Sequence, residues 1–179
     1  NCEPVTRLLE GPLEFNEYEG SSGSTAPYHG LPRFRHCTFS AAYPLGQVAL
    51  SDEDVPLDVQ LQAFNPFIPG DADRSGMPVA ILRYVLTNPS SVPVQASVCG
   101  TARNFISPET SGRKQLITHR VGKRANGFLM HPVAIDHADE NWGTFAMTTT
   151  SQSGITTRSA WADLTWGGAI LDFWDDFSS

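Results

Sequence analysis

The feature that most constrains this chain is a series of short segments with strand character, each ended by proline, glycine, asparagine or aspartate. Within 57–63, apolar residues alternate with Asp58, Gln60 and Gln62, which is typical of a strand with one buried and one wet face. From Arg33 onward such segments recur at intervals of roughly 10 to 15 residues, the spacing of antiparallel sandwiches. The sequence therefore predicts an all-β fold, in the form of a large antiparallel β-sandwich.

Two neighbouring segments predict a hairpin near the middle of the chain. Residues 79–86 are apolar on both faces except for Arg83, so we expect a central strand that is covered on both sides. Turn residues occupy 88–91, and the apolar–polar alternation of 92–99 predicts the partner strand. Further strand candidates bring the expected total to roughly eight to ten: 35–39, 47–51, 115–120, 127–131, 143–150 and 155–160.

Length and local composition predict how the chain is organised. A chain of 179 residues can bury one sizeable core. The polar Gly-Ser stretch at 20–25 and the isolated apolar residues around it predict an irregular N-terminal arm over 1–30, followed by one sandwich domain over 31–179. The chain starts at Asn1 without a methionine and ends directly after the aromatic segment 166–177, so we expect it to be a piece of a longer protein.

Charge and apolar runs exclude several classes of partner. The 12 basic and 19 acidic residues give a net charge of -7, which lacks the surplus of Lys and Arg that a phosphate-backbone binder needs. No nucleic-acid partner is expected, and no transmembrane segment, because no apolar run approaches the roughly 18 residues of a membrane span.

The three cysteines Cys2, Cys37 and Cys99 cannot all pair, and they contain no Cys-x-x-Cys motif. A disulfide scaffold is therefore excluded, and the cysteines do not indicate in which cell compartment the protein resides.

Two groups of residues resemble metal-binding sites but lack a full set of ligands. The segment 71–76 copies the opening of a calcium loop, yet the twelfth position, which needs a closing glutamate, is Leu82. An acidic turn between strands is the better interpretation, and calcium there would need direct evidence. His131 and the His and acidic residues of 136–140 show no spacing that brings three ligands to one point. We therefore expect no metal and no cofactor, and no nucleophile elbow is present.

Aromatic residues gather near the C-terminus, where three of the four tryptophans lie. A helical turn would place Phe173, Trp174 and Phe177 in one apolar stripe, because they are three or four residues apart. Packing or an interdomain contact is the favoured interpretation, and an exposed platform for sugars is the alternative. Periodicity does not decide whether 171–177 is a helical turn, a surface strand or an exposed aromatic handle.

One long run carries a family resemblance. Residues 57–80, which read LDVQLQAFNPFIPGDADRSGMPVA, resemble the N-terminal domain of glycoside hydrolase family 116, a family of β-glucosidases and glucosylceramidases. The similarity continues through 82–89 and is weaker over 44–51 and 172–177. It implies a sandwich of the supersandwich type, as in glucoamylase-like glycosidases, placed before an (α/α)6 barrel. The barrel would hold the nucleophile, the acid/base carboxylate and the glucose-binding residues, so no catalytic residue is assigned to this chain.

The resemblance also implies where this chain could contact substrate and partner. We expect the loop over 65–75 to form one wall of a substrate cleft, with Asn65, Phe67, Asp71 and Asp73 as its candidate residues. A plain interstrand loop stiffened by its prolines is the competing interpretation. Interdomain contacts are expected from Trp166, Trp174 and Phe177. The expected partners are a downstream catalytic barrel of the same polypeptide and a β-glucoside or glycolipid at the interface. The alternative function is a stand-alone carbohydrate-binding or adhesion module.

Overall fold

The computed structural model describes residues 3–14, 30–102, 105–106, 115–121, 126–132, 136–140, 142–162, 164 and 168–178. The chain divides after Ala96 into two compact units, and each is described by itself. Each unit contains one antiparallel sheet, so the all-β prediction is confirmed. The packing of the sheets as a sandwich stays a prediction.

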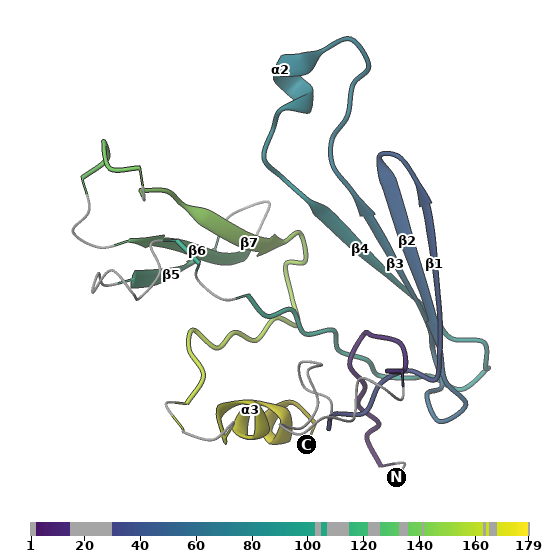
Figure 1. Ribbon diagram of the computed structural model, residues 1–179. Coiled ribbons are helices and arrows are strands. Elements are labelled where there is room, and N and C mark those ends of the chain that lie inside the picture. The colour runs from purple at the N-terminus through teal and green to yellow at the C-terminus, as the bar shows by residue number, and fades with distance from the viewer. Residues whose placement is uncertain are drawn as a thin grey trace. The chain divides into compact units, whose positions relative to one another are not determined.

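The first unit is built on a four-stranded antiparallel sheet whose strands lie side by side in chain order (Figure 1). Its strands are β1 (His36–Ala42), β2 (Leu45–Ser51), β3 (Asp58–Phe64) and β4 (Ile81–Thr87). The connection between β3 and β4 is long and carries the one-turn helix α2 (Ala72–Ser75) at its outer end (Figure 1). This connection contains the loop that the sequence predicts as a cleft wall.

The register of this sheet makes one face apolar throughout, whereas the opposite face contains a polar row and also the apolar row Ala42, Leu45, Phe64 and Ile81. Residues that pair across antiparallel strands point to the same face, and neighbours along a strand point to opposite faces. One face, called the apolar face below, consists of three rows of four paired residues: Cys37, Leu50, Val59 and Leu86; Phe39, Val48, Leu61 and Tyr84; Ala41, Gly46, Ala63 and Leu82. The opposite face contains the polar row Ser40, Gln47, Gln62 and Arg83.

The buried core of the first unit lies at one end of the apolar face. It consists of Phe34, Leu50 and Val59, with Leu9, Val48 and Val55 packed around it. Leu9 comes from the N-terminal segment 3–14, which runs beside the segment 30–34: the Leu8 N–H donates to Pro32 O at 2.8 Å and the Phe34 N–H to Glu10 O at 3.1 Å. The N-terminal segment therefore covers part of the sheet.

An ion cluster fastens this segment to the turn between β2 and β3. Arg7 Nε lies 3.2 Å from Asp52 Oδ2, and the Asp52 side chain is only 1% exposed. Burial alone would raise the pKa of Asp52, but hydrogen bonds from the Asp54 N–H and from Arg7 outweigh it and lower that pKa. Beside this pair, hydrogen bonds from His36, the backbone and Arg35 lower the pKa of Glu53 to about 2.

The second unit holds a three-stranded antiparallel sheet and one helix. Its strands are β5 (Gln115–Val121), β6 (Asn126–Pro132) and β7 (Phe145–Thr149), with β6 in the centre, and the helix is α3 (Gly168–Ser178). Met130 is buried on β6. Gly127 is required where β6 meets β7, because a Cβ there would lie 2.1 Å from the Met147 carbonyl oxygen.

Most predicted strands match observed ones, but three predictions were wrong. Residues 92–99 form no strand in this structure: the backbone groups of Val92 bond to side chains of Asn88 and Ser90, and no backbone hydrogen bond joins 93–96 to a described residue. Consequently β4 pairs only with β3 among the described residues and is an exposed edge strand rather than a covered central one. Residues 155–160 also form no strand; in this segment the Arg158 side chain donates to the Ala160 carbonyl oxygen and to Asp172. Seven strands remain in the described residues.

Two leucines of β2 provide a matched test of the core. Leu50 is 3% exposed and Leu45 is 58% exposed. Leu50→Ala should lower the free energy of unfolding by about 2–5 kcal/mol, because it leaves a cavity in a small core. Leu45→Ala should lower it by less than about 1 kcal/mol. Urea denaturation followed by circular dichroism measures both, and equal losses would contradict the assignment of the core.

The lowered carboxyl pKa values predict a loss of stability in acid. Glu53 has a folded pKa of about 2 against an ordinary value of 4.5, so its contribution is fully present above that ordinary value and is lost as the pH falls toward 2. Glu53→Gln should therefore flatten the fall in unfolding free energy across this range. Urea titrations at closely spaced acidic pH values measure the slope, and an unchanged slope in the variant would show that the cluster does not form.

Candidate functional site

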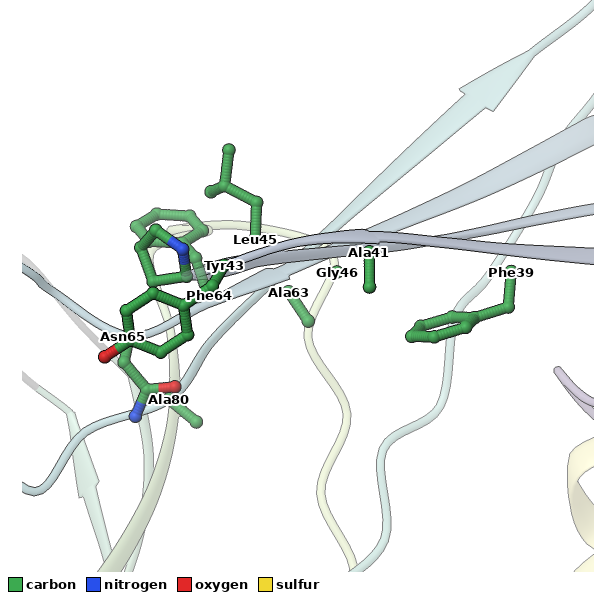
Figure 2. A pocket seen from close by; sticks show the side chains of 10 residues that line it. Phe39, Ala41, Tyr43, Leu45, Gly46, Ala63, Phe64, Asn65 and Ala80 are labelled. Carbon is green, nitrogen blue, oxygen red and sulfur yellow. The ribbon is translucent and has the colours of Figure 1, made fainter.

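An apolar hollow of about 450 Å³ lies at the end of the first sheet where the β1–β2 turn meets the end of β3. Its lining residues are Phe39, Ala41, Tyr43, Pro44, Leu45, Gly46, Ala63, Phe64, Asn65 and Ala80. Figure 2 shows that Phe39, Ala41 and Ala63 point to one side of the sheet and that Leu45 points to the other. The hollow therefore lies around the end of the sheet, lined from the apolar face and from the opposite face, and its size is that of a small-molecule site.

The turn between β1 and β2 supplies the most exposed ring of the hollow. Tyr43 is 85% exposed and precedes Pro44 through a cis peptide bond. Its ring meets Phe67 edge to face, with 5.4 Å between the ring centroids. This geometry is favourable for aromatic pairs, and it joins the hairpin turn to the loop that follows β3.

The loop over 65–80 is braced by its own side chains. The Asn65 Nδ2 group donates to the Val79 carbonyl oxygen at 3.2 Å and so ties the two ends of the loop together. Ser75 Oγ accepts from the Ile68 N–H at 3.0 Å and donates to the Ile68 carbonyl oxygen at 3.1 Å. A loop with such internal bonds presents one defined surface.

The two aspartates of the predicted cleft wall lie at α2. Asp71 is the N-cap of this helix: its Oδ1 accepts from the Arg74 N–H at 3.0 Å, and its Oδ2 lies 3.4 Å from Arg74 Nε. Asp73 is exposed in the first turn. The calcium-like segment 71–76 is thus the helix and its two caps, and both Asp71 oxygens face Arg74.

The predicted interdomain residues behave differently from one another. Phe177 stacks on Phe173 with centroids 6.1 Å apart, and Phe173 stacks on Trp161 at 5.1 Å. Trp174 is half-buried and takes no part in this stack. Trp166 lies outside the described residues. The helical alternative for 171–177 is therefore the correct one, with Phe173 and Phe177 one turn apart on α3.

In the acidic segment 136–140, side chains contribute packing and local hydrogen bonds. His137 lies against Trp142 with ring centroids 4.2 Å apart, and Asp136 accepts from the Ala138 N–H at 2.9 Å. Within the described parts of the chain, no three His, Cys, Asp or Glu side chains come together in a group that could hold a metal ion.

Residues 4–179 match a family model described as beta-glucosidase 2, glycosyl-hydrolase family 116 N-term. The chain belongs to glycoside hydrolase family 116. Membership confirms the resemblance carried by the run 57–80 and places the chain among glycosidases. Because the matched part is the N-terminal domain of family 116, a catalytic partner domain is implied. No curated protein matches the chain.

Sequence reasoning selected Asn65 and the loop beside the hollow, but missed the residues that the first hairpin contributes to it. Phe39, Tyr43 and Leu45 lie on the first hairpin, where the only signal was a large aromatic residue before a proline between two strands. Of the predicted wall residues, the structure brings Asn65 into the hollow and Phe67 against Tyr43, and leaves Asp71 and Asp73 at α2.

Among the described helices, none is both long and apolar enough to cross a membrane.

Ser75 provides a test of how far the loop is pre-organised. Ser75→Ala removes both hydrogen bonds to Ile68 and should raise the rate of tryptic cleavage after Arg74 roughly fivefold, equivalent to about 1 kcal/mol of local stability. Met77→Ala is the control, because this exposed side chain of the same loop forms no hydrogen bond. If the two variants are cleaved at the same rate, the loop is not held by Ser75.

Proposed function

We propose that this chain is the supporting N-terminal domain of a β-glucosidase or glucosylceramidase, and that its hollow and its 65–80 loop form one wall of the substrate cleft of a downstream (α/α)6 barrel. The observation that carries the proposal is an exposed apolar hollow beside a braced loop, in a chain whose family includes a catalytic partner domain. Such a surface can position a substrate without performing chemistry on it.

The electrostatics favour a supporting role over a catalytic one. A glycosidase needs a carboxylic acid with a raised pKa as its proton donor. Among the residues that the structure describes, the two carboxyl groups with a displaced pKa are Asp52 and Glu53; both pKa values move downward, and both groups are held by arginine or histidine. They stay ionised near neutral pH, so they suit ion pairing and not proton donation.

Helix α3 is the second surface that we assign to the partner domain. Arg158 pairs with Asp172 and lies 3.6 Å from Asp176, so these acids and the aromatic stack of Phe173 occupy one side of the helix. At 100° per residue, Leu171 and Trp174 fall on the other side, and Leu171 is 56% exposed. Trp174 is therefore the stronger candidate for an interdomain contact, and Phe177 the weaker one.

A stand-alone carbohydrate-binding module is the second candidate, favoured by one observation. The exposed Tyr43 ring lies in the same hollow as the Asn65 amide, and sugar sites combine a ring for stacking with an amide for hydrogen bonding. The tryptophan platform expected for this function is less suitable, since Trp161 already stacks on Phe173.

Kinetics of the full polypeptide encoded by the gene test the proposal. With an aryl β-glucoside as substrate, Phe67→Ala should raise KM roughly three- to tenfold and change kcat less than twofold, because it removes positioning contacts and no reacting group. Phe105→Ala is the matched control: it also removes an exposed phenylalanine with one aromatic neighbour, and it should leave both constants unchanged.

Three results would contradict the supporting role. The first is β-glucosidase activity in residues 1–179 alone, and the second is a gene that ends at Ser179. The third is saturable calorimetric binding of a glycan to residues 1–179 that is lost in Tyr43→Ala, which would establish the stand-alone module instead.

A further inference from the structure

The open edge of β4 carries backbone groups that no described strand uses. β4 is the last strand of the sheet and has no partner on its second edge within the described residues. Edge strands are normally protected by proline, lysine, a bulge or a covering segment. β4 contains none of these residues, and its one charge, Arg83, lies in the polar row rather than along the edge.

A turn that could bring a strand back to this edge is already formed. Asn88 Nδ2 donates to the Val92 carbonyl oxygen at 2.7 Å, and the Ser90 N–H donates to Asn88 Oδ1 at 3.0 Å. Ser90 Oγ adds a bond to the same oxygen at 2.8 Å. These side chains close the turn over 88–92 without help from strand pairing, so part of the entropy cost of closing a hairpin is already met.

The residues after this turn also have free backbone groups. No backbone hydrogen bond joins residues 93–96 to any described residue. Val92 is 65% exposed, and Val94 and Ala96 alternate with Pro93 and Gln95 in the pattern of an amphipathic strand. Two rows of unpaired backbone groups therefore flank one preformed turn.

We infer that residues 93–96 form a strap that closes onto β4 as a fifth strand, in a second conformation besides the open one in the structure. A turn over 88–92 contains five residues and places Leu86 opposite Val94 and Tyr84 opposite Ala96. This register continues the apolar face by one strand and puts Gln95 opposite Val85 on the polar face. Pro93 then lies at the start of an edge strand, where a missing N–H is tolerated.

The closed strap would change what β4 offers to other molecules. In the open conformation the free edge can pair with a strand of another chain. In the closed conformation the new edge starts with proline and is only four residues long, which makes it a poor template for pairing. The strap is thus a device that opens or blocks β4.

Disulfide trapping tests the strap in the full polypeptide with its native cysteines replaced by alanine. Val85→Cys with Gln95→Cys joins two residues that face each other in the closed register, where paired Cα atoms lie within disulfide range. The matched control is Val85→Cys with Val94→Cys, whose side chains would point to opposite faces. Under mild oxidation the first pair should cross-link at least tenfold faster than the control, and equal rates would overturn the strap.

Amide exchange provides an independent measurement on the unmodified protein. Closing should slow exchange at least tenfold at those amides of 94–96 that point toward β4, because an edge strand donates every second amide to its neighbour. Exchange at the unstructured rate would show that the strap remains open. Val94→Asp, which places a charge on the apolar face, should restore fast exchange while leaving the protection of β2 and β3 unchanged.

Discussion

The alignment of apolar side chains on one face of four adjacent strands is the constraint on which the rest of the first unit depends. Because the register aligns apolar residues in three complete rows, one face of the sheet must be covered and the other can meet water. The N-terminal segment covers one end of this face, where Leu9 packs on the Phe34, Leu50 and Val59 core. The other end remains open at the hollow.

The two ends of the face are stabilised by different interactions. At the core end, the buried Asp52 carboxylate would be costly without Arg7, so the ion pair and the apolar contacts of Leu9 depend on each other. At the hollow end there is little burial, and order comes from short-range bonds such as those of Asn65 and Ser75. A surface built in this way can lose a contact to a ligand without disturbing the distant core.

Sequence patterns predicted where strands occur along the chain better than they predicted which neighbours each strand has in the fold. Alternation identified β3 and propensity identified β5 to β7, because both depend on local residues. The position of β4 could not be predicted, since an apolar strand such as Val79–Leu86 looks the same at an edge and in the centre. At the site, the family resemblance indicated Asn65 and Phe67, whereas Tyr43 was missed because its place beside Phe67 depends on two turns far apart in sequence.

The hollow and α3 share a property that bears on function. Both combine an internally fixed side with an apolar side that meets solvent: Tyr43 is positioned by Phe67, and Trp174 lies on a helix that Arg158 fastens through Asp172. Exposed aromatic residues on fixed supports lose little side-chain entropy when they are covered, which favours association with a rigid partner. The catalytic barrel that we propose in the same polypeptide would be such a partner, and the tether would raise its effective concentration at both surfaces. Modest apolar contacts at each surface are then sufficient for a stable arrangement of the two domains.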